Sequence, residues 1–552
     1  MVKEVNIMKA DSIIYGNIVT LDTDNILCEA MVVKNGIIVY VGSKDIANTM
    51  IGKRTKILDY GNCFIYPGFM DAHTHGPLAA ERLALQAQLV GQKSMQDYID
   101  IMRKYVEDNP DKKYYLGSGF DMLGEANAAM LDEICPDKPM VLRTSDGHTI
   151  WTNTACMKEC GVDRKFADFY GPAEVHVDKD GNPTGVFCEK PLFEITKRYE
   201  TSLEDMKKAL LVWQKFAFSQ GITAVGEAYP DMSPICIEAY DELVKEGKWK
   251  LRTYAYAVNK DTAFLNPEKT GEKLKELADK YNSEYFKITG QKIILDGVVE
   301  AHTAAMIDEY SDQKGYYGVL NIKSASHLKK IVESCNKAGF PVHTHAIGDK
   351  AAKMILDAYE AVETETCNFD IRNVICHLQC IRKEDIKRCG DYNVISVVAP
   401  TWAPILHPDF DNTLKYLGPE RAWSQYPLKS FEDAGATICF HTDYPINTII
   451  NAPMSIYSAV KRALPIEYCS ECGVRSVFLP DEAISSLRAL LAMSANIAYM
   501  FNEERRLGKL QIGMIANASV YNKDFVDYAK SSDIMKAKLV ATIVDGEEVY
   551  HS

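Results

Sequence analysis

The sequence predicts an α/β fold, a (β/α)8 TIM-like barrel with a small β-sandwich domain built from both chain ends. Three observations favour this fold. Strands and helices alternate through the middle of the chain, both ends are rich in β-strand patterns, and histidines and acids follow several of the predicted strands. At 552 residues, the chain is long enough for one barrel with additions.

The two ends of the chain carry clear hairpin signals. Near the start, "AMVVKNGIIVYVGS" places two β-rich runs around Asn35-Gly36, and near the end "LVATIVDGEEVYHS" repeats this arrangement around Asp545-Gly546. Asn-Gly and Asp-Gly are favoured in two-residue hairpin turns, because both central positions require a positive φ. We therefore predict that residues 1–67 and 506–552 combine into one sandwich around the rest of the chain.

The central part alternates between strand and helix patterns. "AGFPVHTHAIGDKAAKMILDAYEAVE" combines an apolar strand with an amphipathic helix, and "NVICHLQCIRKEDIKRCG" repeats that order. Such βα repeats produce a parallel sheet, so we assign residues 68–505 to the barrel. The segment of about residues 76–291 is far longer than three βα units need. We expect it to hold an insertion at the active face.

The charge and composition of the sequence indicate which kinds of molecule the protein is expected to bind. The net charge of −14 argues against nucleic acid and anionic membrane, because both require a basic surface. No secretory signal and no run of about 18 apolar residues is visible. Fifteen cysteines without a disulfide framework fit a reducing cytoplasm, and the single CxxC pair, Cys469 and Cys472, has no second pair at zinc-ribbon spacing. We expect a cytoplasmic protein that binds a small-molecule substrate.

The stretch "GFMDAHTHG" contains two histidines two residues apart, at the predicted end of a strand. In extended backbone, residues i and i+2 point to the same side, so His73 and His75 form a candidate pair of metal ligands. A polar turn with incidental histidines is the alternative, and the pair alone does not decide between them.

Three further donors stand at the ends of other predicted strands. His345 follows "FPVHT", His377 closes "NVICH" and Asp443 follows "TICFHT". From His345 to His377 is 32 residues and from His377 to Asp443 is 66, as expected for two successive strands and then one two strands further on. Catalytic groups of such barrels gather at the C-terminal ends of the strands. The donors therefore predict a zinc-like catalytic site with an open position for water.

The blocks around these donors resemble the amidohydrolase superfamily, in the branch that includes the N-substituted formamide deformylases. "YPGFMDAHTHG", "VHTHAIGDKAA", "ICHLQ" and "HTDYPI" resemble the metal motifs of its first, fifth, sixth and eighth strands. "GQKIILDGVVEAHTAAM" resembles the fourth-strand block, and "TSDGHTIWTNTA" and "NPTGVFCEK" match two more blocks. The resemblance covers nearly the whole chain and implies a centre of one or two divalent metal ions, with zinc expected, inside the barrel.

The resemblance also implies a role for each donor. His73 and His75 would bind the more buried ion, and His345 and His377 the more exposed one. Asp443 would touch a metal and handle the proton of the attacking water.

Lys292 stands where the family has a lysine that reacts with carbon dioxide and bridges two metals as a carbamate. An unmodified lysine is cationic at neutral pH and a poor ligand, whereas the carbamate is an anionic oxygen donor. Two alternatives stay open. Lys292 could be an ordinary barrel lysine paired with Asp296, or Lys287 could be the carboxylated residue.

Five residues are candidates for substrate binding. His148, in "SDGHTIW", resembles a family residue that lines the substrate pocket, where it would also help to polarise the substrate carbonyl. His302 stands where the branch commonly has arginine, which argues against an inherited contact with an anionic group. Phe120, Trp151 and Trp402 are aromatic candidates for a pocket wall that suits an aryl or alkyl group, and core packing is the alternative for each.

The predicted function is hydrolysis of a non-peptide C–N bond in an N-acyl or N-formyl amine. A divalent metal lowers the pKa of bound water toward about 7, and Asp443 would act as general base and then general acid. Ring deamination and hydrolysis of a cyclic amide or ester are alternatives on the same fold. A remote alternative is an inactive metal-binding scaffold, against which the complete donor set argues. Such folds commonly form homodimers, and the sequence does not decide the oligomeric state.

Overall fold

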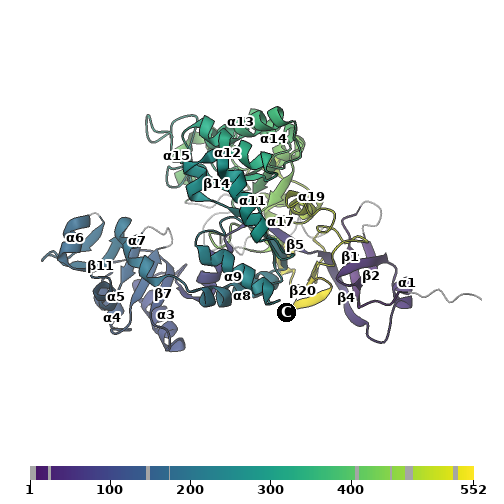
Figure 1. Cartoon of the computed structure of the whole chain (residues 1–552), viewed down its shortest axis with the longest axis horizontal. Coiled ribbons are helices and arrows are strands. Elements are labelled where there is room, and N and C mark those ends of the chain that lie inside the picture. The colour runs from purple at the N-terminus through teal and green to yellow at the C-terminus, as the bar shows by residue number, and fades with distance from the viewer. Residues whose placement is uncertain are drawn as a thin grey trace, which may run out of the picture. The chain divides into compact units, whose positions relative to one another are not determined.

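Figure 1 shows the computed structural model of the chain. The structure describes residues 8–22, 27–122, 124–144, 149–172, 174–404, 409–447, 450–465, 477–525 and 532–552. His148, Cys469 and Cys472 lie outside the described residues, so what we expect of them stays a prediction. The chain divides into two compact units, Met1–Gly76 with Gln214–Ser552, and Pro77–Trp213.

Eight parallel strands form a nearly closed barrel in the larger unit, which confirms the predicted fold class. Asp443 N–H donates to the His73 carbonyl at 3.1 Å and His75 N–H to the Tyr444 carbonyl at 2.9 Å, so the chain after the last strand lies beside the first strand. In sheet order, which is also chain order, the strands are β5 (Phe69–Thr74), β12 (Ile222–Glu227), β13 (Arg252–Ala257), β14 (Phe286–Ile294), β15 (Val342–Ala346), β16 (Val374–His377), β17 (Ile395–Val398) and β18 (Ile438–Phe440).

Most barrel strands are buried along their length, because they contact side chains on both faces of the sheet. Their sequences are therefore continuous apolar runs such as "VICH" and "ISVV" rather than alternating patterns. Among the described residues, no helix is long and apolar enough to cross a membrane. Helix α8 (Leu203–Ser219) begins in the unit Pro77–Trp213 and ends in the larger unit. The larger unit also contains the helices α9 (Pro234–Lys245), α10 (Lys260–Leu265), α11 (Thr270–Lys280), α12 (Ala325–Lys337), α13 (Asp349–Thr366), α14 (Lys383–Asp391), α15 (Asp409–Ala422), α16 (Leu428–Asp433), α17 (Ala452–Lys461), α19 (Ser486–Ala492) and α20 (Ala495–Met500).

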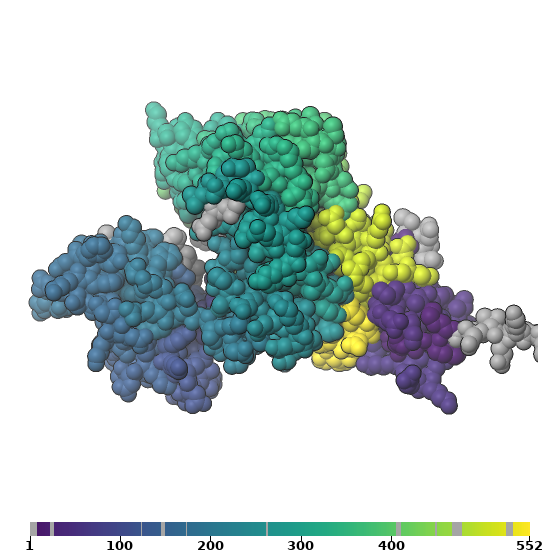
Figure 2. Space-filling model, in the orientation of Figure 1, coloured from purple at the N-terminus to yellow at the C-terminus, as the bar shows by residue number. Residues whose placement is uncertain are grey.

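Both chain ends contribute strands to one seven-stranded sheet. Figure 1 draws these strands in purple and yellow, and Figure 2 shows the atoms of the two ends side by side in the same colours. Strand β19 (Ala518–Tyr521) pairs antiparallel with β4 (Lys56–Pro67), so residues far apart in the sequence are neighbours. The remaining strands are β1 (Ser12–Val19), β2 (Leu27–Lys34), β3 (Ile37–Gly42), β20 (Leu539–Val544) and β21 (Glu547–His551), with helix α1 (Lys44–Thr49) after β3. The boundaries 1–67 and 506–552 that we predicted for this domain stay predictions.

The two predicted hairpin turns are confirmed. Asn35 and Gly36 join β2 to β3 with φ of 52° and 75°, and Asp545 and Gly546 join β20 to β21 with φ of 54° and 77°. Ile14, Ile18 and Val33 from the first end pack with Val520 and Ile543 from the last, which gives the sheet a shared apolar core. Burial of this surface stabilises the sheet only when both ends are present.

The second unit, Pro77–Trp213, has its own six-stranded sheet in the order β10-β11-β9-β8-β7-β6. It is narrower than the expected insertion of about 76–291, because β12 and β13 already belong to the barrel. Its elements are β6 (Gln86–Gln88), β7 (Tyr115–Phe120), β8 (Met140–Thr144), β9 (Thr149–Thr152), β10 (Val175–Val177), β11 (Pro183–Cys188), α3 (Met95–Asp108), α4 (Ala128–Asp132), α5 (Thr154–Glu159), α6 (Arg164–Tyr170) and α7 (Lys190–Thr196), preceded by α2 (Gly76–Ala84).

Candidate metal centre

The predicted metal donors lie at the C-terminal ends of barrel strands. The spacing of 32 and 66 residues corresponds to β15, β16 and β18, with β17 between the last two. Parallel strands bring these ends to one face of the barrel, where catalytic groups of such folds gather. The donors are His73 in β5, His75 directly after it, Lys292 in β14, His345 in β15, His377 at the end of β16 and Asp443 after β18.

His73, His75 and Asp443 form the tightest cluster. Asp443 Oδ1 lies 3.1 Å from His73 Nε2 and 3.2 Å from His75 Nε2, yet this buried oxygen has no hydrogen-bond partner among the described residues. Ligand atoms of the three residues lie within 4.8 Å of one another. Buried polar atoms normally find a partner, so donors that converge without hydrogen-bond geometry fit a shared divalent cation.

His345 and His377 form a second pair beside this cluster. Their ring centroids are 4.5 Å apart, and His345 Nε2 lies 3.2 Å from the Gly297 carbonyl oxygen. The backbone φ angles of His377 and Asp443 are 82° and 59°. Residues other than glycine rarely adopt such positive values. Such backbone strain is concentrated at functional sites, and here it falls on two predicted ligands.

Burial keeps the imidazoles of the centre in the form that binds metals. It lowers the pKa of His345 and of His441 to about 4, and it lowers the pKa of His73 and of His377 well below the ordinary value. Burial alone would raise the pKa of Asp443, but the nearby histidines hold it below its usual range. At neutral pH these four imidazoles are therefore neutral, and the Asp443 carboxylate is ionised.

Lys292 is buried in the barrel, and its Nζ has no hydrogen-bond partner within the part of the chain that the structure describes. Burial lowers the pKa of this amine to about 8. The alternative pairing with Asp296 does not form, because that carboxylate accepts backbone N–H groups from Ala305, Ile347 and Gly348 at 2.8–3.0 Å.

Lys287, the other lysine considered for carboxylation, lies elsewhere. Its Nζ is 2.5 Å from Glu503 Oε1 and 5.7 Å from the centroid of the Tyr254 ring. Its amine is engaged by a carboxylate that is not one of the candidate metal donors, so Lys287 is a poor candidate for the bridging position. This leaves Lys292 as the candidate for the bridging position.

Two residues behind the ligands hold the cluster in shape. The sequence predicts His343 to support the ligands or to pack in the core, and it assigns no role to Asp71. Asp71 Oδ1 accepts the N–H groups of His73 and Thr442, both at 3.1 Å, and its Oδ2 accepts the Thr442 hydroxyl at 2.5 Å. It thereby ties the first strand to the Asp443 segment. His343 Nε2 lies 2.8 Å from His73 Nδ1, which orients the opposite nitrogen of His73 toward Asp443.

Glu227, at the end of β12, is a third supporting residue, and the sequence analysis did not assign it to the site. Its Oε2 accepts the Gly76 N–H at 2.5 Å and its Oε1 accepts the Tyr229 N–H at 3.1 Å. Burial raises the pKa of this carboxyl to about 7. It fixes the chain that leaves His75. Only its place at a strand end could have identified it.

Comparison with known proteins places the chain in a family. Residues 56–550 match the sequence pattern that defines amidohydrolases. The chain belongs to the amidohydrolase family. Protein LONG AFTER FAR-RED 3 from Arabidopsis thaliana is 28% identical over 550 residues, 97% of this chain and 90% of that protein. N-substituted formamide deformylase from Arthrobacter pascens is 24% identical over 555 residues, 97% of each chain.

A solved structure shows the same fold. An uncharacterized metal-dependent hydrolase from Pyrococcus furiosus superimposes with a TM-score of 0.74 and 24% identity, over 93% of this chain and 99% of that one. The predicted family and the predicted fold are therefore confirmed.

A cavity of about 480 Å³ opens beside the metal donors of this amidohydrolase. It is lined by His345, His377 and Asp443, and Trp402 lies in its wall with its ring stacked on His377 at 5.5 Å and 16°. Phe410 and Phe478 add further aromatic surface. Of the predicted pocket residues, Trp402 is thus brought to the centre.

Three other predicted pocket residues are placed differently. Phe120 and Trp151 are fully buried in the core of the Pro77–Trp213 unit, with ring centroids 5.9 Å apart. His302 Nε2 lies 3.2 Å from Asp312, and the His302 ring packs on Tyr416 rather than lining the cavity. A large aromatic ring fills a core as readily as a pocket, so sequence alone could not separate these roles.

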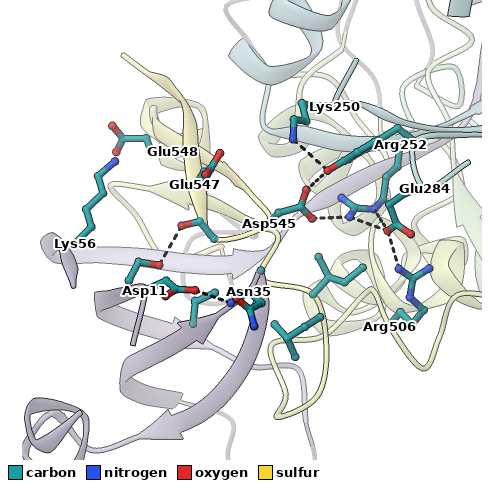
Figure 3. Close-up of a pocket in the computed structure, with 17 residues that line it drawn as sticks. Asp11, Asn35, Lys56, Lys250, Arg252, Glu284, Arg506, Asp545, Glu547 and Glu548 are labelled. Carbon is teal, nitrogen blue, oxygen red and sulfur yellow. Dashed lines mark hydrogen bonds and ion pairs between the residues drawn. The ribbon is translucent and has the colours of Figure 1, made fainter. Parts of the chain in front are cut away.

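Another cavity, of about 730 Å³, lies where the sheet built from both chain ends meets the N-terminal ends of the barrel strands (Figure 3). Arg252 Nη2 donates to Asp545 Oδ1 at 2.5 Å and to Glu284 Oε1 at 3.0 Å, and Arg506 donates to the same glutamate at 2.6 Å. Tyr285 donates its hydroxyl to Asp545 Oδ2 at 2.6 Å. We assign this network to holding the sheet against the barrel.

Proposed function

We propose that this amidohydrolase is a metal-dependent enzyme that hydrolyses a non-peptide C–N bond, with N-acyl and N-formyl amines as substrates. The observation that carries the proposal is the cluster of His73, His75 and Asp443, whose donor atoms converge without hydrogen bonds. The likeness to N-substituted formamide deformylase supports this substrate class. A cytoplasmic location and a homodimer remain part of the proposal.

The donors fit one or two divalent ions, and zinc suits the imidazole-rich set. His73 and His75 would hold one ion, His345 and His377 the other, and Lys292, once carboxylated, would bridge them. Carboxylation joins the Lys292 nitrogen to carbon dioxide and releases one proton. Burial of the amine, with a pKa of about 8, supports this step because part of it is unprotonated at neutral pH.

Each side chain then has a stated task. When bound, the divalent metal lowers the pKa of water toward about 7 and polarises the substrate carbonyl. Asp443 accepts the proton of the attacking water and returns it to the departing nitrogen as the C–N bond breaks, which yields a carboxylic acid and an amine. His148 is proposed to assist the carbonyl oxygen. Trp402 would hold an aryl or alkyl substituent in the cavity beside His377.

Metal content per chain, measured by elemental analysis together with intact mass at mild pH, tests the proposal first. We expect two metals, a mass increment of about 44 units for carbon dioxide on Lys292, and turnover of N-formyl or N-acyl amines. One metal per chain with release of ammonia from ring amidines would favour the deaminase alternative. Absence of metal after reconstitution with zinc or manganese would contradict the proposal.

A further inference from the structure

Gln379 lies two residues after the candidate metal donor His377, and the proposed function gives it no task. It lines the cavity of about 480 Å³ that His345, His377 and Asp443 also line. The residue is 4% exposed, so its side-chain amide is almost enclosed. Buried amides normally satisfy both their N–H groups and their carbonyl oxygen, so each side of the Gln379 amide requires a partner.

A chain of two hydrogen bonds fixes the orientation of this amide. Gln425 Nε2 donates to the Ala422 carbonyl oxygen at 2.9 Å, and Gln425 Oε1 accepts a hydrogen bond from Gln379 Nε2 at 2.6 Å. A backbone carbonyl can only accept, so neither amide can be turned over without placing two oxygens against each other. Gln379 Oε1 is therefore held in one orientation.

Gln379 Oε1 is the atom of this amide that the protein leaves open. Among the described residues nothing donates to this oxygen, yet it is not one of the buried polar atoms that lack a partner. Because Gln379 is enclosed elsewhere and lines the cavity, the open oxygen faces the cavity. It presents a fixed hydrogen-bond acceptor to whatever molecule occupies that space.

The rest of the cavity wall indicates which chemical group would meet this acceptor. Trp402, Phe410 and Phe478 provide aromatic surface. Apart from Asp443, which belongs to the metal centre, the one charged side chain in the described part of the wall is that of Glu300. A carboxylate on the ligand would meet an acid and an acceptor here, whereas both would favour an N–H group.

A purely structural role is the competing explanation, and it accounts for only one side of the amide. Gln379 Nε2 satisfies the buried Gln425, and the Tyr426 N–H donates to the Gln379 backbone carbonyl at 3.0 Å, which ties the same two segments. Neither hydrogen bond uses Gln379 Oε1. A structural role therefore leaves the acceptor that faces the cavity unexplained.

We propose that Gln379 is a specificity-determining residue, whose Oε1 accepts a hydrogen bond from an N–H group on the substituent of the substrate. The scissile nitrogen already has Asp443 as its proton partner, so the donor belongs to the substituent. The substrates would be N-acyl or N-formyl amines that combine an aromatic or alkyl body with a second N–H group. The inference rests on the proposed function for the metal and for the cavity as the substrate site.

The test measures binding to the zinc-loaded protein, and not turnover. The probes are benzohydroxamic acids, whose two oxygens bind zinc, with an amino group at the ortho, meta or para position of the ring. Each is paired with the methyl compound of the same shape. For at least one position, wild type should bind the amino probe about 3- to 10-fold more tightly than its methyl counterpart, as expected for one neutral hydrogen bond. Gln379→Met, which has a similar length and no strong acceptor, should lose this preference.

Gln511→Met is the matched control, because Gln511 bonds Asp22 at 2.9 Å and does not line the cavity. It should keep the wild-type preference. Gln379→Met would overturn the inference if it kept the preference, or if it lost affinity equally for amino and methyl probes, as a structural role predicts. A wild-type protein that prefers no amino probe would also overturn it, and this result requires no variant to fold. If no hydroxamate bound the zinc-loaded protein, the metal centre of the proposed function would itself be contradicted, and this inference with it.

Discussion

The barrel carries two polar clusters, and they differ in how their charges are satisfied. At the N-terminal ends of the strands, Arg252 is tied to Glu284 and Asp545 by ion pairs of 3.0 and 2.5 Å (Figure 3). At the C-terminal ends, Asp443 Oδ1 and Lys292 Nζ are buried, and neither has a hydrogen-bond partner in the described parts of the chain. Charges that are paired within the protein stabilise its fold without any ligand. Charges left unpaired in a buried cluster lower its stability unless something else binds, which marks the second cluster as the functional one.

The largest expected difference between the clusters concerns activity. Asp443→Asn should lower kcat/KM on an N-formyl amine by about 10³-fold or more, because the variant loses the general base and a charged ligand. The melting temperature of the metal-free protein should change little, since Asp443 Oδ1 makes no hydrogen bond there. Asp545→Asn, the same change in the other cluster, should keep wild-type kcat/KM per folded molecule. Equal losses of activity in both variants would contradict the comparison.

The reverse pattern is expected at the N-terminal ends of the strands. Arg252→Leu should lower the free energy of unfolding by about 2–4 kcal/mol, because Asp545 loses its paired cation and Glu284 keeps only Arg506. The loss is expected below the upper end for a buried pair, since the side chains of Glu284 and Asp545 are 40% and 23% exposed and remain partly hydrated. Urea denaturation measures the loss. A variant as stable as wild type would show that the network does not hold the sheet.

The dependence of stability on pH gives a third comparison. In the metal-free, carbon-dioxide-free protein the pKa of Lys292 is about 8, below the value of 10.5 in the unfolded chain. The unfolded chain binds this proton more tightly, so stability should rise as pH increases from about 8 to about 10.5, by up to about 3 kcal/mol. Lys292→Met should lack this rise. Urea titrations at pH 7.5 and 10 measure the difference, and parallel curves for the two proteins would rule the interpretation out.

The smallest effect on stability is expected for the solvent-exposed ion pair in the cluster at the N-terminal ends of the strands. Arg506 and Glu284 have side chains that are 42% and 40% exposed, so their ion pair is screened by water and salt. Arg506→Ala should lower the free energy of unfolding by about 1 kcal/mol or less, and less still in concentrated salt. A loss as large as that of Arg252→Leu would mean that exposure does not separate the two arginines.

The places of the candidate metal donors at strand ends could be predicted from the sequence because their signal is local. A histidine or acid at the end of an apolar run identifies both the strand and the edge where its side chain lies, as for His345, His377 and Asp443. The same logic predicted the turns at Asn35-Gly36 and Asp545-Gly546, where residue type and backbone conformation are directly linked.

The supporting residues could not be found in this way, because their roles depend on contacts between distant segments. Asp71 acts through Thr442, 371 residues away, and no pattern near either residue shows the hydrogen bond. From the sequence, Phe120 and Trp151 were as well suited to a core as to a pocket wall. The structure places both in a core. The unit Pro77–Trp213 has its own strands and helices, so its limits depend on which strands join the barrel.

The pairing of β19 with β4 also constrains how the protein is made. Strand β4 ends at Pro67 and its partner begins at Ala518. At about 5–20 residues per second, a ribosome needs roughly 20 to 90 s to synthesise the chain between them. During that time β4 has an open edge, and unpaired edges of this kind can join to other chains. We expect the nascent N-terminal strands to depend on a chaperone or on rapid completion of synthesis, and a chain that ends before Ala518 to aggregate.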